Sequence, residues 1–153
     1  MKDVLFKLNE FCGANRIEYM VTGTTALSLL GAPSSFVPQD MDIKVFHLTE
    51  EQAKKFKELE FLAGFENEHY DHGQCFSFII DGIKVNAIVD NTRDCDSILA
   101  QSVAVNFEDE KKAKRHLINI QLVNLALANK MKLRRNKDKA YLLDLIHNLT
   151  SLV

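Results

Sequence analysis

The segment from residue 21 to residue 46 constrains the fold of this chain more than any other part of its sequence. A short apolar strand, Arg16–Val21, runs almost directly into Gly23 and Thr24. An apolar helix is expected from there to about residue 30, followed by a loop rich in Gly, Pro and Ser. Because glycine permits a tight backbone turn and close approach of a ligand, this order predicts a strand, a sharp turn and a helix at a binding site.

Two carboxylates follow the loop, at Asp40 and Asp42, and they lead into the apolar strand Ile43–Phe46. Side chains two residues apart on a strand point to the same face. Like charges on one face repel each other unless another group uses them, and the usual group is a divalent cation. The pair therefore predicts a metal site, although Asp-x-Asp is also common by chance in exposed turns before a strand.

The turn and the two carboxylates together describe a nucleotide site. Gly23, Thr24 and Thr25 present a free backbone and two hydroxyls at the start of a helix, an arrangement that suits an anion. Asp40 and Asp42 suit one or two Mg²⁺ ions, which prefer carboxylates and phosphate oxygens. Phosphates beside metal predict a nucleoside triphosphate as substrate, with phosphoryl or nucleotidyl transfer as the chemistry.

Length and composition favour one ordinary globular domain over residues 1–153, with 46% hydrophobic and 26% charged residues. The net charge of −2 excludes attraction of the whole molecule to nucleic acid or to membranes. No apolar run approaches the roughly 20 residues of a membrane span, and the first residues lack a signal-peptide core. The three cysteines are odd in number and form no Cys-x-x-Cys pair, which predicts a reduced, cytoplasmic protein.

A β-hairpin is the clearest local signal in the second half of the chain. The apolar runs Cys75–Ile80 and Ile83–Val89 are joined by Asp-Gly at 81–82, the strongest short-range hairpin signal. A two-residue turn fixes the register and places Ser77 opposite Asn86. Asn86 then lies in the middle of a strand, on a face that mixes polar and apolar side chains.

The remaining segments alternate helices with short strands. Helices are predicted over 3–12, 49–60, 122–133 and 137–149, and strands over 65–70, 103–107 and 117–120. Thr49 and Gln52 fit a capping box, and the last helix is expected to turn Ala140, Leu143 and Ile146 inward. Residues 108–115 are interpreted as a charged, mobile, solvated segment. This order predicts an α+β fold with a mixed, mostly antiparallel sheet, helices packed against it and C-terminal helices.

The residues 17–146 resemble the nucleotidyltransferase superfamily, which includes DNA polymerase β, aminoglycoside and lincosamide nucleotidyltransferases and AbiEii-type toxins. The resemblance rests on Gly23-Thr24, the following ThrAlaLeuSerLeu helix, Asp40-Met41-Asp42, and Lys130 followed by Lys137-Asp138. It implies a nucleotidyltransferase-like fold and Mg²⁺-dependent transfer of a nucleoside monophosphate to a hydroxyl acceptor. It also implies that Asp40 and Asp42 bind metal, with a two-metal site possible, and that Lys130 contacts the nucleotide.

One departure from the family pattern bears directly on catalysis. The family places a third carboxylate on a later strand, and the matching position in Gly82-Ile83-Lys84-Val85 is followed by Asn86. An amide oxygen ligates Mg²⁺ but brings no charge and is no base. The alternative is therefore a catalytically degenerate fold that acts as a nucleotide-binding or partner-binding module.

The acceptor is left open by the sequence, among a small molecule, tRNA and a protein, and no membrane partner is expected. Residues 130–139 hold six basic residues and one acid. This segment is interpreted as a solvated turn between two helices or as a basic wall that meets triphosphate or a polyanionic acceptor.

Overall fold

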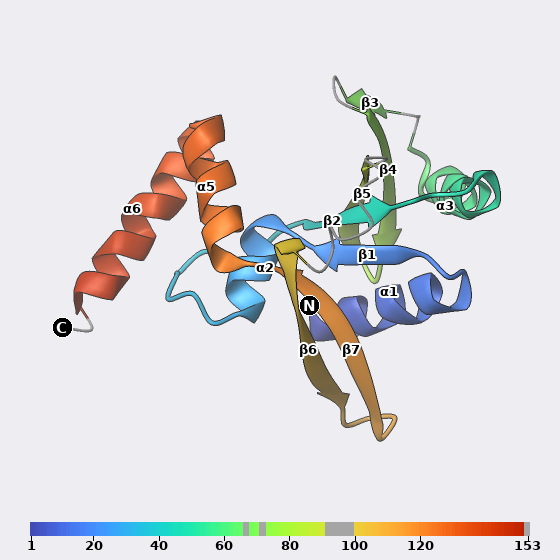
Figure 1. Cartoon of the computed structure of the whole chain (residues 1–153), viewed down its shortest axis with the longest axis horizontal. Coiled ribbons are helices and arrows are strands. Elements are labelled where there is room, and N and C mark those ends of the chain that lie inside the picture. The colour runs from blue at the N-terminus through green and yellow to red at the C-terminus, as the bar shows by residue number, and fades with distance from the viewer. Residues whose placement is uncertain (66–67, 71–72, 91–99, 152–153) are drawn as a thin grey trace.

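A seven-stranded sheet forms the centre of the described part of the chain in the computed structural model, which describes residues 1–65, 68–70, 73–90 and 100–151 (Figure 1). The strand order is β3-β4-β5-β2-β1-β7-β6, with four antiparallel and two parallel pairs of neighbours. The strands are β1 (Glu18–Val21), β2 (Met41–Phe46), β3 (Glu68–Tyr70), β4 (Gly73–Ile80), β5 (Ile83–Asp90), β6 (Ser102–Asp109) and β7 (Lys114–Gln121).

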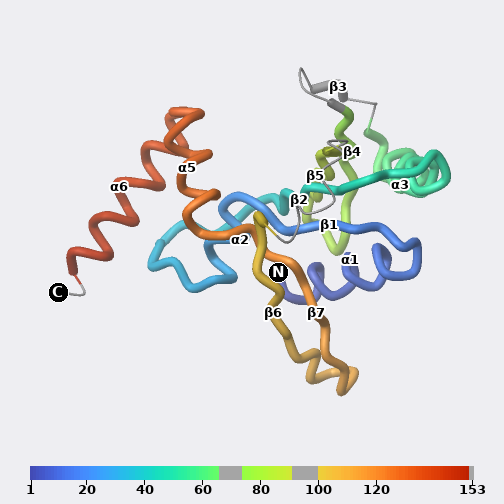
Figure 2. Tube along the Cα trace, viewed as in Figure 1, coloured from blue at the N-terminus to red at the C-terminus, as the bar shows by residue number. Residues whose placement is uncertain are grey.

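The helices divide into a group on one face of the sheet and a pair at its end (Figure 2). They are α1 (Lys2–Ala14), α2 (Gly23–Leu29), α3 (Glu50–Ala63), α5 (Val123–Leu133) and α6 (Asn136–Ser151). Both α1 and α3 pack on the sheet, whereas α5 and α6 stand beyond α2. The predicted α+β class, mixed sheet and C-terminal helices are thus confirmed. No helix among the described residues is long and apolar enough to cross a membrane.

The main core lies between the sheet and the two helices α1 and α3. Alternate residues of β2 and β5, such as Ile43 and Val85, are fully buried there with Leu8 of α1. Phe56 of α3 stacks on Phe76 of β4 at a centroid distance of 5.3 Å. Because side chains alternate across a strand, the residues between these core positions point to the opposite face of the sheet.

A smaller apolar cluster joins the helix pair to the rest of the molecule. It consists of Leu27 of α2, Ala126 of α5 and Tyr141 and Leu145 of α6. Its neighbour in α2, Ala26, belongs instead to the main core. α2 therefore packs on both sides, and it holds α5 and α6 beside the polar turn at its own start.

Two local predictions are confirmed by the backbone. The Thr49 side chain accepts a hydrogen bond from the Gln52 N–H, and the Gln52 side chain accepts one from Thr49 N–H, which completes the capping box of α3. The 81–82 turn gives the expected register, with Ser77 opposite Asn86.

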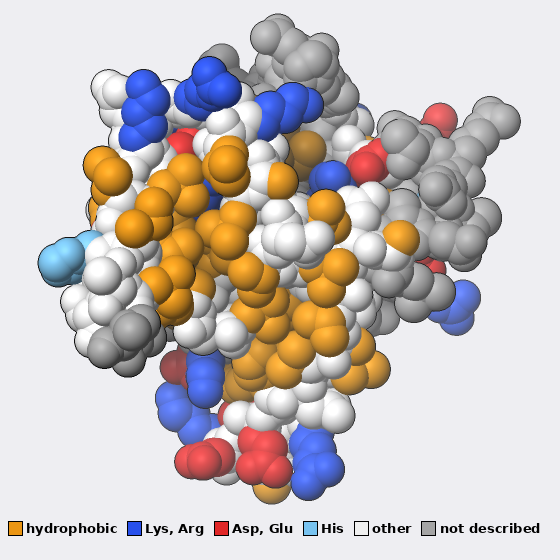
Figure 3. Space-filling view, turned by 60° about the vertical axis from the view of Figure 1, so that its left-hand side comes forward, with side chains coloured by type: hydrophobic (Ala, Val, Ile, Leu, Met, Phe, Trp, Pro, Cys, Tyr) orange, Lys and Arg blue, Asp and Glu red, His pale blue; other side chains and the backbone are white. Residues whose placement is uncertain are grey.

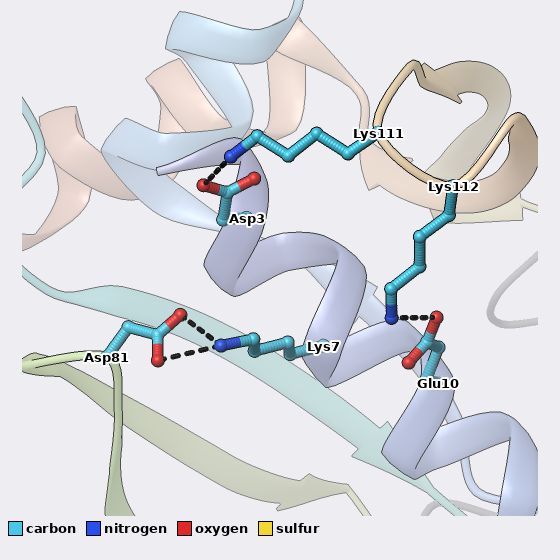
Figure 4. Close-up of polar contacts among 6 residues, drawn as sticks. All are labelled: Asp3, Lys7, Glu10, Asp81, Lys111 and Lys112. Carbon is cyan, nitrogen blue, oxygen red and sulfur yellow. Dashed lines mark hydrogen bonds and ion pairs between the residues drawn. The ribbon is translucent and has the colours of Figure 1, made fainter.

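The charged segment 108–115 was predicted wrongly as a mobile region. Its ends extend β6 and β7 into one hairpin, and Lys111 and Lys112 at the turn reach Asp3 and Glu10 of α1 (Figure 4). Most of these residues are exposed, as the interleaved charges indicated, but Asp109 is buried. The cross-strand pairing of residues 102–121 and the ion pairs to α1 order the backbone.

The inward face of α6 was also predicted wrongly. Leu143 and Ile146 are 68% and 59% exposed and Ala140 is exposed, whereas Asp138, Tyr141 and Leu145 are buried. The reason is that α6 meets α5 and α2 through a stripe that contains a buried ion pair. Figure 3 shows hydrophobic side chains gathered on the outer surface at this side of the molecule.

Candidate functional site

The turn before α2 brings the backbone against a carboxylate of β2. Gly23 has a φ of +64°, and a Cβ atom on it would lie 3.8 Å from Asp42 Oδ2. The Gly23 N–H donates to Gln121 Oε1 at 3.2 Å, and the Thr22 N–H donates to the Asp42 carbonyl at 2.9 Å. The tight turn predicted at Gly23 is therefore present in its conformation.

The two threonines at the start of α2 point in different directions. The Thr25 side chain is buried, and its hydroxyl donates to the backbone carbonyl of Asp40 at 3.2 Å. Thr25 therefore holds the loop that precedes β2. The Thr24 hydroxyl instead accepts a hydrogen bond from Lys130 Nζ at 2.7 Å, so that α5 touches the same turn that Asp42 approaches.

The second carboxylate and the amide lie side by side on parallel strands. Asp42 of β2 is the register partner of Asn86 of β5, and Asn86 Nδ2 donates to Asp42 Oδ1 at 3.0 Å. The other end of the amide is also occupied, because Ser77 Oγ donates to Asn86 Oδ1 at 2.8 Å. In this orientation Asn86 presents a donor to Asp42, where a third carboxylate would present an acceptor.

Asp40 completes the set of carboxylates that the sequence singled out. It lies one residue before β2 and is exposed, while Asp42 is half-buried and Met41 between them is fully buried. Among the described residues, no group of three or more His, Cys, Asp and Glu side chains forms a metal cluster. Asp42 thus lies against the turn before α2, whereas the contact of Asp40 with α2 is made through its backbone carbonyl.

The helix side of the site contains a buried cation. Lys130 is 8% exposed, and its ammonium lies 3.7 Å from Asp138 Oδ1 and 4.6 Å from the centroid of the Tyr141 ring. Burial is the main cause that lowers the pKa of Lys130, and the charge of Asp138 opposes this shift. The ammonium is therefore poorly solvated and held at the Thr24 hydroxyl.

Asp138 is the anchor of that cation, and it is fully buried. Its carboxylate also accepts hydrogen bonds from Arg135, the shortest from Nε at 2.7 Å. Burial alone would raise the pKa of Asp138, but the hydrogen bonds and charge of Arg135, together with Lys130, hold this pKa below its ordinary value. Asp138 consequently remains ionised, paired with the cations Lys130 and Arg135.

Two polar contacts at the site were not predicted from the sequence. Lys44 lies two residues beyond Asp42 on the same face, and its ammonium is 3.7 Å from Asp90 Oδ2. The alternation of side chains along β2 was the sequence signal that places Lys44 on the same face as Asp42. Gln121 caps the Gly23 N–H, and no local signal shows this contact because it depends on the parallel pairing of β7 with β1.

Comparison with known proteins supports a nucleotidyltransferase-like fold. No family model and no curated protein matches the sequence. One similar crystal structure is that of a Thermotoga maritima protein for which a nucleotidyltransferase function has been suggested. The TM-score is 0.61, and the identity is 20% over 95% of this chain and 91% of that one. An antigenic nucleotidyltransferase-like protein from Paracoccidioides brasiliensis is similar with a TM-score of 0.55 and 15% identity over 95% of this chain and 73% of that one.

At these levels of identity the likeness concerns the fold. The resemblance seen in the sequence and the likeness seen in the structure therefore agree on a nucleotidyltransferase-like fold. The chemistry must be argued from the residues of the site itself.

Proposed function

We propose that this protein binds a nucleoside triphosphate together with Mg²⁺ and transfers the nucleoside monophosphate to a hydroxyl group of an acceptor. One observation carries the proposal. The consecutive residues Gly23 and Thr24 are approached on one side by the Asp42 carboxylate and on the other by the Lys130 ammonium. A metal-binding acid and a phosphate-binding cation thus meet at one turn of the backbone.

The donor set suits magnesium that arrives with its nucleotide. Mg²⁺ is usually held by one or two carboxylates plus substrate phosphates and water, and Asp40 and Asp42 supply two such carboxylates. When bound, the ion would neutralise charge on the phosphates and orient them for in-line attack. Since the described residues supply no third carboxylate to this group, the free ion should bind weakly and the magnesium–nucleotide complex much more tightly.

The helix side supplies the phosphate contact in this proposal. Lys130 is held by Thr24 and Asp138, so its ammonium loses little freedom when a phosphate oxygen replaces the Thr24 hydroxyl. An interaction with phosphate is stronger at such a poorly solvated position than on the open surface. Lys130 would therefore bind and orient the triphosphate, and it has no role as a base.

Calorimetric titration of the protein with the four magnesium–nucleoside triphosphates tests this binding. The wild type should bind at least one of them, and the isosteric double variant Asp40→Asn/Asp42→Asn should lose most of the affinity. Lys130→Met should weaken nucleotide binding at any magnesium concentration. The control is Asp3→Asn/Asp81→Asn, which removes two exposed carboxylates far from the turn. Absence of binding by the wild type, or equal binding by the site variant, would refute the proposal.

A second candidate function is nucleotide binding without turnover. Its supporting observation is the hydrogen bond from Asn86 Nδ2 to Asp42 Oδ1, which fills the third carboxylate position with a neutral donor. An amide neither deprotonates a hydroxyl nor adds charge to a metal site. The protein would then act as a nucleotide-dependent binding module.

Transfer assays separate the two candidates. Labelled triphosphates are incubated with candidate acceptors, and pyrophosphate release is followed for the wild type and for Asn86→Asp. Turnover by the wild type supports the enzyme, and turnover only by Asn86→Asp supports the binding module. Triphosphate binding with no turnover by any variant contradicts the enzyme but leaves the binding module standing.

A further inference from the structure

Four cations at the turn between α5 and α6 have no acidic partner among the described residues. Lys132, Arg134, Lys137 and Lys139 are all exposed, and we name them the basic ridge. The acid of this segment, Asp138, is buried and already paired with Lys130 and Arg135. The charge of the basic ridge is therefore not compensated locally.

A second basic segment of the same chain shows the opposite arrangement. Lys111 pairs with Asp3 at 3.2 Å, and Lys112 pairs with Glu10 at 3.4 Å (Figure 4). Lys114 also lies 3.7 Å from Glu10. Arg115 in turn lies 3.5 Å from Glu108. Both segments are basic and exposed, but the cations of this second segment have acidic neighbours and, among the described residues, those of the basic ridge do not.

The charge of the whole chain sharpens this difference. Residues 130–139 carry six basic residues and one acid, a net charge of +5, and the whole chain carries −2, so the remainder carries −7. Lys and Arg side chains crowd the α5–α6 end of the molecule (Figure 3). A polyanion is thus attracted to this end and repelled by most of the remaining surface.

The basic ridge is continuous with the candidate site. Lys130, which touches Thr24, belongs to the last turn of α5, and Arg134 lies four residues further on, about 6 Å along the helix axis. An extended polyanion on the basic ridge would therefore bring its end to the turn that Asp42 approaches.

We propose that the basic ridge binds the phosphate backbone of a single-stranded nucleic acid, and that this strand is the acceptor. The acceptor role rests on the proposed function, whereas the binding does not. In the transfer step the terminal hydroxyl oxygen bonds to the α-phosphorus, the bond from that phosphorus to the β-phosphate oxygen breaks, pyrophosphate leaves, and the hydroxyl proton passes to water. A single strand is required because its terminal nucleotide has to bend from the basic ridge into the site.

Binding is measured first, without nucleotide. Fluorescence anisotropy follows a labelled oligouridylate and a labelled oligodeoxythymidylate between about 50 and 200 mM salt. Two to four phosphate contacts on a single strand predict a slope between about −1.5 and −3 for log K against log salt. The ridge variant Lys132→Gln/Arg134→Gln/Lys137→Gln/Lys139→Gln should bind at least about tenfold more weakly at the lowest salt, with a slope near zero. Preference for the ribose or the deoxyribose strand identifies which nucleic acid is bound.

The matched control is Lys111→Gln/Lys112→Gln/Lys114→Gln/Arg115→Gln, which also lowers the net charge by four. It should keep the wild-type slope, because its cations are already paired. Equal weakening in both variants, or no binding by the wild type, would overturn the inference. Equally tight binding of polyglutamate would overturn it too, since the partner would then be an acidic protein.

Transfer is measured next, with labelled triphosphate and the unlabelled strand. Transfer to the strand by the wild type, lost in the ridge variant while that variant still binds magnesium–nucleotide, supports the acceptor role. Strand binding without nucleotide binding contradicts the proposed function but still supports the binding of nucleic acid by the basic ridge. Nucleotide binding with no strand binding contradicts the basic ridge alone.

Discussion

The sheet side and the helix side of the candidate site are held by different forces. On the sheet side, strand register places Asn86 beside Asp42, and hydrogen bonds from neutral groups, Asn86 and Ser77, fix their side chains. On the helix side, a buried cation, Lys130, is held by the buried anion Asp138. A hydrogen bond contributes about 0.5–1.5 kcal/mol between neutral groups and about 1.5–3 kcal/mol to a charged group, whereas breaking a buried ion pair costs about 3–5 kcal/mol.

This difference indicates where the site tolerates change. The backbone ladder between β2 and β5 keeps its register whichever polar side chain stands at position 86, so an amide there is compatible with the fold. The helix side has no such freedom, because removal of Asp138 leaves Lys130 buried without its counter-charge. We therefore expect the larger losses of stability from substitutions of the buried ion pair on the helix side and smaller losses from substitutions on the sheet side.

Asp138→Ala is expected to have the largest effect on stability. It leaves the Lys130 ammonium without an anion in a poorly solvated position, at a cost of about 3–5 kcal/mol of unfolding free energy. Urea denaturation measures the change. Arg135→Ala is the control, because Arg135 is about half exposed and water can replace its contact with Asp138. Equal losses in the two variants would remove the distinction between the two sides of the site.

Acid should destabilise the protein through the same carboxylate. Because the pKa of Asp138 is lower in the folded protein than its ordinary value of 3.8, the unfolded chain binds more protons in acid. The stability from this group is complete above the ordinary pKa and disappears as the pH falls through the folded value. Denaturation of the wild type and of Asp138→Asn between neutral and acid pH measures it. An unchanged difference in stability at every pH would contradict this expectation.

Asn86→Asp is expected to cost about 1–2 kcal/mol in the absence of metal, since the new carboxylate would lie about 3 Å from Asp42 Oδ1. Magnesium should restore this loss in the variant and leave the wild type nearly unchanged. Thermal unfolding with and without Mg²⁺ measures both effects. A magnesium response of equal size in the two proteins would show that position 86 takes no part in metal binding.

Gly23→Ala is expected to cost about 1–2 kcal/mol, because an alanine is strained at a φ of +64°. The added Cβ meets Asp42 Oδ2 at an ordinary contact distance of 3.8 Å, so the backbone supplies most of the cost. Gly13→Ala is a matched control in α1, where the new methyl group meets nothing within 4 Å. There helix propensity predicts a gain of up to about 1 kcal/mol. Thermal unfolding of both variants checks the opposite signs.

Several features of this protein were decided locally and could be predicted from the sequence. The Asp-Gly turn fixes the register of β4 on β5, and with it the position of Ser77 opposite Asn86. Thr49 and Gln52 define the start of α3 through their own hydrogen bonds. These signals succeed because the interacting groups are only a few residues apart along the chain.

Other features depended on contacts between distant parts of the chain. Residues 108–115 read as a solvated segment because the ion pairs that order them come from α1, about a hundred residues away. The face of α6 was missed because apolar spacing did not reveal that a buried carboxylate, Asp138, would face inward with Tyr141 and Leu145. In that helix the buried face includes the counter-ion of Lys130, whereas Leu143 and Ile146 are exposed.

The candidate site shows the same division. The sequence alone predicted which residues would carry the chemistry, namely Gly23, Asp40, Asp42 and Lys130, and it shows that position 86 holds an amide. Only the tertiary structure decided that β5 runs parallel beside β2, so that this amide donates to Asp42, and that α5 brings Lys130 to Thr24. The physical reason is that residue chemistry and local spacing are written in the chain, whereas the partner of each buried polar group is selected when the whole core packs.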